Sequence, residues 1–335
     1  MTALWPGSEI FTVSNYKFST SFHALFTDYQ NIIGGGKYSS LLESIAKQSI
    51  RPQHIYVVQP NGYAPPEDKL GYEEYIHTDK GMWNQRIYGM EYCFSQKEHS
   101  KYLLVCDDDV SFEPDFAEKL LSIAEKHDID TLVPIQDHRN GFFKNMMLCL
   151  LGERTETGTS PFKITIKTNG RYKVNNFLES NVNPTQSGPF QCFLMKTDIT
   201  PVLNLREEMW LDDTRYAWPD DQVFFYKAYL RGLRTFSCKS PSFKHLDGKS
   251  GVTGKQRMMD SSYSHARNIV IFWHRFIKPE KKTVRAKMIA KTSFGYYIAM
   301  ASLMKILVGL KQRDFSCYKQ FRRGICDGRR FVESD

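Results

Sequence analysis

The sequence lacks the cysteine patterns of disulfide-rich and zinc-binding proteins. Its 335 residues contain seven cysteines, an odd number, and no C-x-x-C pair. This pattern excludes a disulfide framework and a zinc ribbon, and it favours a reducing compartment. The first 30 residues also lack the continuous apolar run of a secretory signal, because Ser8, Glu9, Ser14, Asn15 and Lys17 interrupt them. We therefore expect no export.

Several nucleotide-binding and hydrolase motifs are also missing. The chain contains no G-x-G-x-x-G, G-x-S-x-G or H-E-x-x-H, which leaves nicotinamide binding, serine hydrolysis and zinc proteolysis without support. Gly34-Gly35-Gly36-Lys37 is not a phosphate loop, because Tyr38 stands where that loop needs Ser or Thr.

The positive charge is confined to one end of the chain. Composition excludes a mainly disordered protein, since 41% of the residues are hydrophobic and 14% are aromatic. The net charge is +8, but residues 275–335 hold 15 Lys and Arg against 5 Asp and Glu, a surplus of ten. The remaining body carries a net charge of −2 and offers no basic groove for nucleic acid.

Short apolar strands alternate with amphipathic helices in the first half of the sequence. The pattern predicts helices over residues 39–48, 83–94, 115–127 and 220–230, strands over 54–58, 102–106, 131–134 and 189–196, and a hairpin over 162–174 around Asn169-Gly170. Such alternation is typical of an α/β domain with a largely parallel sheet.

The C-terminal segment has a different character. An apolar run at residues 269–273 has basic flanks, and the 18 residues 293–310 are apolar apart from Lys305. Eighteen residues are at the lower limit for crossing a bilayer, so an interfacial helix with basic flanks is favoured. A transmembrane helix remains the alternative.

Two acidic clusters are candidates for chemistry. Asp107-Asp108-Asp109 directly follows the apolar run 102–106, and open α/β sheets bind ligands at the ends of their strands. Three adjacent carboxylates repel one another unless a cation offsets them, which favours Mg²⁺ or Mn²⁺ with a diphosphate. The alternative is a solvated loop before the next helix.

The second acidic cluster, Asp220-Asp221, stands at the start of a predicted helix. One carboxylate there could cap the helix while the other deprotonates a hydroxyl group, although both could be caps. His245 lies thirteen residues beyond Gly232 and is either a metal ligand or a structural histidine.

The order of these segments resembles the family 2 glycosyltransferases from residue 39 to residue 248. Residues 41–58 match the family's opening helix and second strand, and Arg86-Ile87-Tyr88-Gly89 matches its R-N-x-G segment. Residues 102–110 match its hydrophobic strand and D-x-D motif. Asp220 to Gly232 follows its E-D-x-x-L-x-x-R-x-x-x-x-G helix, with Lys227 at the basic position, and His245 stands where the family has a metal-binding histidine.

The resemblance implies an α/β GT-A nucleotide-diphospho-sugar transferase fold, with a mostly parallel central sheet flanked by helices and a basic helical C-terminal extension. It implies an inverting transfer in which Asp221 is the catalytic base and Asp109 and His245 hold Mg²⁺ or Mn²⁺. Asp107 and Asp109 would be the acids of the D-x-D motif. Gln59, Arg86, Asp107 and Asp108 would bind the nucleotide-diphospho-sugar donor.

Three positions depart from the family pattern. Gln59 follows Val57-Val58 where the family has its base-reading acid, which leaves the base of the donor open. Asp220 replaces the usual Glu, and Ile87 replaces the usual Asn. Residues 1–38 lack the opening strand with T-x-N-R and offer only the stretch Phe18-Ser19-Thr20-Ser21-Phe22.

We therefore expect a poorly assigned segment 1–38, a GT-A catalytic domain 39–262 and a membrane-associating segment 263–335. The last segment resembles the tails of bacterial members that build surface polysaccharides on lipid-linked acceptors. The resulting hypothesis is a cytoplasmic glycosyltransferase at the inner face of the cell membrane, with a nucleotide sugar, a glycan or lipid-linked acceptor and an anionic membrane surface as partners, and without nucleic acid. A metal-dependent nucleotidyltransferase and a non-catalytic membrane-surface module remain alternatives.

Overall fold

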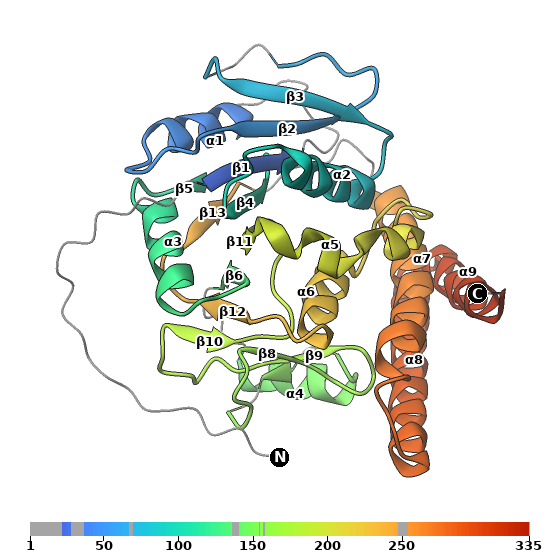
Figure 1. Cartoon of the computed structure of the whole chain (residues 1–335). Helices are drawn as coiled ribbons and strands as arrows, with labels where there is room; N and C mark the ends of the chain where they lie inside the picture. Colours follow the sequence, from blue (N-terminus) through green and yellow to red (C-terminus); the bar gives the residue numbers. More distant parts are fainter. Residues whose placement is uncertain are drawn as a thin grey trace.

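The computed structural model describes residues 22–27, 37–66, 70–135, 141–153, 155–156, 158–246 and 254–334. A twisted sheet runs through the middle of the molecule, and helices cover both of its faces (Figure 1). Most of the segment 1–38, including Phe18-Ser19-Thr20-Ser21 and Gly34-Gly35-Gly36, lies outside the described residues.

The central sheet has eight strands in the order β10-β12-β6-β11-β4-β1-β2-β3. The strands of the whole chain are β1 (Phe22–Thr27), β2 (Ile55–Pro60), β3 (Glu73–Thr78), β4 (Tyr102–Asp107), β5 (Val110–Phe112), β6 (Thr131–Pro134), β7 (Thr155–Glu156), β8 (Ile164–Ile166), β9 (Tyr172–Val174), β10 (Val182–Pro184), β11 (Cys192–Lys196), β12 (Thr235–Cys238) and β13 (Phe243–His245). Strands β3, β2, β1 and β4 are parallel, and β11 lies antiparallel between β4 and β6. Two smaller sheets pair β5 with β13, and β7 and β8 with β9.

Helices pack against both faces of the sheet and continue into a C-terminal group. They are α1 (Lys37–Ala46), α2 (Met82–Ser95), α3 (Phe116–Lys126), α4 (Phe142–Leu150), α5 (Thr200–Leu203), α6 (Asp220–Leu230), α7 (Gly254–Phe272), α8 (Val284–Gln312) and α9 (Ser316–Ser334), with short helical segments η1 (Thr197–Ile199), η2 (Leu205–Leu211) and η3 (Trp273–Ile277). Helices α7, α8 and α9 stand together at one side of the molecule (Figure 1).

Strand β4 explains how the sheet separates two hydrophobic cores. Leu103 and Val105 point to one core, which α2, α6, α7 and α8 complete. Leu104 and Cys106 point to the other core, which α1 and α3 cover. Because successive side chains of a strand point to opposite faces, a continuous apolar run is required where both faces are buried. The structure therefore confirms the strand predicted from the apolar run 102–106, which lies in the middle of the sheet.

Most predicted elements are present near their expected bounds. The predicted helix 220–230 coincides with α6, and the predicted hairpin is β8 and β9, with Gly170 at a positive φ of 79°. The opening strand, for which the sequence offered only residues 18–22, is β1 at 22–27 and pairs with both β2 and β4. The sequence also gave no sign of β3 or of α4.

The C-terminal helices are part of the fold. The expected boundary at residue 263 falls inside α7, whose residues Ile269, Ile271 and Phe272 belong to the main core. Tyr297 of α8 is also fully buried there. The basic segment is thus attached to the rest of the chain by shared core packing.

Helix α8 is long and apolar enough to cross a membrane by length and composition alone, and only 11% of its most apolar window is buried. One face of α8 nevertheless makes specific contacts. The Trp273 and Phe294 rings stack with centroids 4.6 Å apart, His265 Nε2 lies 2.8 Å from the Tyr297 hydroxyl, and Lys305 Nζ donates to Ser262 Oγ at 3.0 Å.

Two glycines let α9 approach the backbone of α7. A Cβ at Gly324 would collide with the carbonyl oxygen of Tyr263, and one at Gly328 would lie 2.6 Å from the carbonyl oxygen of Arg267. The spacing of four residues places both glycines on one face of α9. The close contact of these helices therefore depends on the absence of side chains at these positions.

Replacing Gly324 with Ala tests this packing. We expect Gly324→Ala to lower the unfolding free energy by about 1–3 kcal/mol, because the added methyl group overpacks a backbone contact. Gly295→Ala is the matched control, since Gly295 lies in α8 with open space around it. Alanine there should be neutral or stabilising. Equal thermal unfolding temperatures for Gly324→Ala and the wild type would contradict the proposed packing.

Candidate active site

The acidic triplet lies at the carboxyl end of β4, where it was predicted. Asp107 is the last residue of β4, and its backbone N–H donates to the carbonyl oxygen of Gln191 at 2.9 Å. Asp108 and Asp109 form the turn between β4 and β5. In the sheet, Asp107 pairs with Thr27 of β1, which in turn pairs with Val58 of β2. The triplet therefore stands beside the ends of two neighbouring parallel strands.

Arg86 of α2 joins the two acidic clusters. Its guanidinium group donates to Asp107 Oδ1 at 2.7 Å and to Asp220 Oδ2 at 2.5 Å, and it lies 4.5 Å from the centre of the Phe190 ring. Only 4% of Arg86 is exposed. The strand carrying the triplet and the helix carrying Asp220-Asp221 are thus held by one buried cation.

Burial sets the protonation of this group of charges. It raises the pKa of Asp107 and of Asp220 above the usual range, although Arg86 opposes the shift in both cases. Burial by itself would lower the pKa of Arg86, but the two carboxylates raise it above its ordinary value. Arg86 therefore stays charged and favours the ionised form of both partners.

Asp212 fixes the start of α2 and thereby the position of Arg86. Its carboxylate accepts hydrogen bonds from the backbone N–H groups of Trp83 at 2.9 Å and Asn84 at 2.6 Å. Free N–H groups in the first turn of a helix attract an acidic cap. This cap comes from a residue about 130 positions away, so the sequence near α2 did not predict it.

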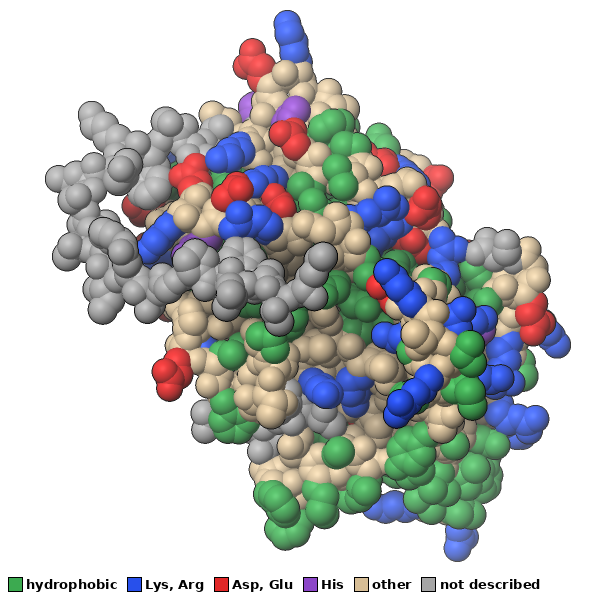
Figure 2. All heavy atoms as spheres, turned by 60° about the horizontal axis from the view of Figure 1, so that its bottom comes forward, with side chains coloured by type: hydrophobic (Ala, Val, Ile, Leu, Met, Phe, Trp, Pro, Cys, Tyr) green, Lys and Arg blue, Asp and Glu red, His purple; other side chains and the backbone are tan. Residues whose placement is uncertain are grey.

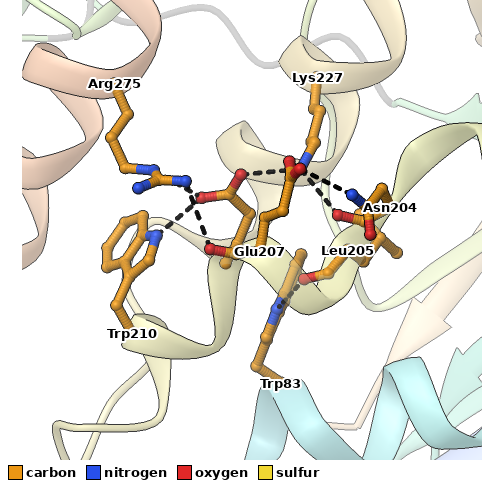
Figure 3. A network of polar contacts seen from close by, with 8 residues as sticks. Trp83, Asn204, Leu205, Glu207, Trp210, Lys227 and Arg275 are labelled. Atoms are coloured by element: carbon orange, nitrogen blue, oxygen red, sulfur yellow. Dashed lines mark hydrogen bonds and ion pairs between the residues drawn. The ribbon is translucent and has the colours of Figure 1, made fainter. Parts of the chain in front are cut away.

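Lys227 anchors the other end of α6 (Figure 3). The Lys227 ammonium group donates to the Asn204 carbonyl and to both Glu207 and Glu208, at 2.8–2.9 Å. Glu208 also accepts from Trp210 Nε1 and from Arg275 Nε, at 2.7 and 3.1 Å. The catalytic-helix candidate α6 is therefore connected through Glu208 to η3, just before the basic C-terminal helices.

A cavity of about 460 Å³ lies beside the start of α6. Asp221 and His245 line it from α6 and β13, and Tyr172 of the β8–β9 hairpin adds an aromatic side chain. Burial, followed by the charge of Asp220, raises the pKa of Asp221 to about 7. A carboxylate with this pKa can both accept and release a proton near neutral pH.

The remaining acid of the triplet faces His245. Asp109 Oδ1 lies 3.2 Å from His245 Nε2. Antiparallel pairing of β13 with β5 sets this approach, and the backbone N–H of Leu246 donates to the carbonyl oxygen of Asp109 at 2.7 Å. The described part of the chain contains no group of three or more His, Cys, Asp or Glu side chains that could hold a metal ion. Asp109 and His245 form a pair of possible ligands.

The structure brings most of the predicted residues to one end of the sheet. Asp107 and Arg86 are in contact, Asp109 and His245 face each other, and Asp221 shares the cavity with His245. Gln59 is buried near the end of β2, with Asp108 in the turn after β4.

Sequence reasoning did not find Asp212, Phe190 or Tyr172. Their contacts come from distant parts of the chain. For Asp212 and Phe190 the sequence carried no local signal, whereas Tyr172 was placed in the predicted hairpin without a role.

Removing the guanidinium group of Arg86 should leave two buried carboxylates without a counter-ion. We expect Arg86→Met to lower the unfolding free energy by about 3–5 kcal/mol at pH 8. The loss should shrink toward pH 5. Without Arg86 the folded-state pKa of both acids rises further, so protonation relieves the buried charge as the pH falls.

Urea unfolding at pH 8 and pH 5 measures this effect. Arg206→Met is the control, because Arg206 pairs with Glu91 at the surface and such pairs contribute about 0–1 kcal/mol. A pH-independent loss, or a loss as small as that of the control, would show that Arg86 does not neutralise these acids.

Comparison with known proteins gives a family match and two similar folds. Residues 72–198 match glycosyl transferase family 2, a range that includes Arg86 and the triplet but excludes Gln59, Asp221 and His245. The crystal structure of GalNAc-T7 with UDP, GalNAc and Mn2+ is similar with a TM-score of 0.51 and 11% identity over 85% of this chain. The match spans 57% of the length of the GalNAc-T7 chain.

A second solved structure, S. aureus TarS 1-349 in complex with UDP, matches with a TM-score of 0.42 and 14% identity over 94% of this chain and 90% of that chain. No curated protein sequence matches. At these identities a structural likeness indicates the fold alone. The TM-score of 0.51 with GalNAc-T7 shows the GT-A fold, and the match of residues 72–198 to glycosyl transferase family 2 supports a glycosyltransferase.

Proposed function

We propose that this protein transfers a sugar from a nucleotide-diphospho-sugar to a hydroxyl group of an acceptor, with inversion at the anomeric carbon. The observation that carries the proposal is the shared cavity of Asp221 and His245, with His245 held against Asp109 at the end of β4. The proposed proton acceptor and one of the two candidate metal ligands thus line the same space. The family match over residues 72–198 supports the same reaction class.

Asp221 would act as the base. As the acceptor oxygen bonds to the anomeric carbon, its proton passes to the Asp221 carboxylate, and the bond from that carbon to the diphosphate oxygen breaks. The nucleoside diphosphate leaves with the electron pair of that bond. A base whose pKa is about 7 is suited to this task near neutral pH. Attack from the side opposite the leaving group requires no covalent enzyme intermediate.

Asp109 and His245 would hold the divalent cation. Adjacent ligands of a six-coordinate Mg²⁺ or Mn²⁺ lie about 3 Å apart, since each bond is about 2.1 Å long. The 3.2 Å between Asp109 Oδ1 and His245 Nε2 fits this spacing. Carboxylate and imidazole groups together suit Mn²⁺, and diphosphate oxygens and water would complete the coordination. The bound cation would stabilise the negative charge of the leaving diphosphate.

The donor would lie over the ends of β2 and β4. Gln59 and Asp108 would contact it there. Asp107 and Arg86 would lie on the diphosphate side, where their ion pair would hold both side chains in position. We propose a uridine nucleotide as the first donor to test, because the similar structure of GalNAc-T7 holds UDP and Mn2+.

The C-terminal helices support a proposal for the acceptor and for the location of the protein. We propose residues 39–262 as the catalytic unit and residues 263–335 as the part that brings it to the cytoplasmic face of the cell membrane. The acceptor would then be a glycan or a lipid-linked sugar of cell-surface polysaccharide synthesis. The surplus of ten positive charges in residues 275–335 is what supports this placement.

Replacing Asp221 with Asn tests the assignment of the base. We expect Asp221→Asn to reduce sugar transfer by about 10²–10⁴-fold, because the amide cannot accept the proton. UDP binding in the presence of Mn²⁺, measured by calorimetry, should be retained. Asp198→Asn, a change to an exposed acid, should leave transfer unchanged. Full transfer activity in Asp221→Asn would refute the mechanism.

The pKa of Asp221 also predicts a pH dependence. Transfer by the wild type should fall as the pH drops through about 7, when the base becomes protonated. Stability should respond in the opposite direction. A carboxyl whose folded-state pKa is raised from 3.8 to about 7 destabilises the fold increasingly as the pH rises between these values. Asp221→Asn should therefore unfold at a higher temperature than the wild type at pH 8, and by a smaller margin at pH 5.

Nucleotide binding tests the metal pair without a turnover assay. We expect Mn²⁺ to strengthen UDP binding to the wild type at least tenfold, and we expect His245→Ala to lose most of this gain. His127→Ala, a change outside the cavity, should keep it. Binding of UDP that is equally strong with Mn²⁺ and with a chelator would reject the metal assignment.

A further inference from the structure

Helix α4 exposes almost all of its apolar side chains. Phe142 and Phe143 are 77% and 76% exposed, and Met146, Met147 and Leu150 are also exposed. These positions share one face, since residues four apart lie one above the other on a helix. No residue of α4 is buried. A short isolated helix gains its stability mainly by packing an apolar face, and this face has no partner within the described chain.

Helix α8 continues this apolar surface. Its residues Ile289, Tyr296, Leu303 and Leu310 are all exposed and recur every seven positions, which places them along one side of the helix. The buried residues Ala290 and Tyr297 lie about 100° further round the helix. The helix is therefore held against the protein along one face and presents an apolar stripe on a neighbouring face.

The two helices meet directly. The hydroxyl group of Tyr296 donates to the carbonyl oxygen of Leu150, the last residue of α4. Figure 2 shows hydrophobic side chains gathered over α4 and over α8 on the same face of the molecule, with Lys and Arg side chains beside them. We call these exposed side chains of α4 and α8 the apolar platform.

Positive charge predominates along the two helices, with Glu153, Glu280 and Asp314 just beyond their ends. Residues 281–313 contain eight Lys and Arg and no Asp or Glu, and residues 141–152 contain Lys144 as their only charged side chain. Aromatic and aliphatic side chains bordered by Lys and Arg are typical of helices that lie in the interface of an anionic bilayer. The position of Lys305 agrees, because its ammonium group is bonded to Ser262 of α7 and does not face lipid.

We propose that α4 and α8 together dock this protein on an anionic lipid bilayer, with Phe142 and Phe143 inserted below the headgroups. In this arrangement α8 lies along the bilayer surface, and α4 adds an insertion point that the basic C-terminal segment lacks. The bilayer would cover the platform and leave the buried face of α8 packed on the protein.

The platform is joined to the wall of the cavity. Lys167 Nζ donates to the carbonyl oxygen of Gly152, and Arg171 pairs with Glu153 at 2.8 Å, so the chain just after α4 is fixed to the β8–β9 hairpin. Tyr172 of that hairpin lines the cavity of Asp221. Docking would thus place the hairpin side of the cavity near the bilayer, which favours an acceptor anchored in the membrane. This last step rests on the proposed function.

Co-sedimentation with vesicles tests the docking surface. Full-length protein should bind vesicles of phosphatidylglycerol and phosphatidylcholine more tightly than vesicles of phosphatidylcholine alone. The double variant Phe142→Ser, Phe143→Ser should weaken binding to the anionic vesicles at least tenfold. Tyr72→Ser combined with Val202→Ser is the matched control, because both residues are exposed but lie away from α4 and α8. This control should bind as the wild type does.

Three outcomes would overturn the proposal. The first is equal binding of the wild type and the Phe142, Phe143 variant, and the second is no binding of the wild type to anionic vesicles. The third is a wild-type dimer in light scattering that becomes a monomer in this variant, since a second copy would then cover the platform. A folded variant is recognised by an unchanged thermal unfolding temperature.

A fluorescent label measures insertion directly. Met146→Cys is labelled with an environment-sensitive dye in a chain whose Cys149, Cys317 and Cys326 are changed to Ser. Its emission should shift to shorter wavelength with anionic vesicles, whereas the same label on Val202→Cys should not respond. An unshifted emission at position 146 would reject insertion of α4.

The docking proposal and the proposed sugar transfer can be refuted independently of each other. Vesicle binding requires no donor, and Mn²⁺-dependent UDP binding requires no vesicle. Normal vesicle binding with full transfer by Asp221→Asn would refute the mechanism alone. Loss of vesicle binding with intact UDP binding would refute the docking alone.

Discussion

The contact of Arg86 with Asp107 and Asp220 is the constraint on which the site depends. One buried guanidinium group is shared by the end of β4 and the start of α6, two elements that are more than one hundred residues apart. Burying either carboxylate without a cation would be costly, so the two elements are stable in this arrangement only together. Asp221, next to Asp220, and Asp109, two residues after Asp107, are thereby held near this contact.

Further charged contacts hold the elements around the site. Asp212 caps α2 and so orients Arg86, while Lys227 ties α6 to Glu208. Glu208 in turn accepts from Arg275 at the start of the basic segment. A chain of buried charge-assisted contacts therefore runs from the acidic triplet to the helices that carry the surplus positive charge. The basic helices are consequently connected to the site through shared buried contacts.

The sequence predicted what local patterns encode. Helix α6 and strand β4 were predicted almost to the residue, and the triplet, Asp220-Asp221 and His245 lie near one another at one end of the sheet. It could not reveal the partners of Arg86 or the cap from Asp212, because contacts between distant residues leave no periodicity. Helix α4 was not predicted, for a different reason. Seven of its nine residues are apolar, so a polar face is nearly missing and no helical period stands out.

The pairing of β13 with β5 limits how the chain can vary in length. His245 faces Asp109 because its strand pairs with Val110 in a single register. Inserting or deleting one residue between Gly232 and Phe243 could shift that register by one position, which would turn His245 to the opposite face of this two-stranded sheet. The length of this connection is therefore tied to the position of His245 beside Asp109.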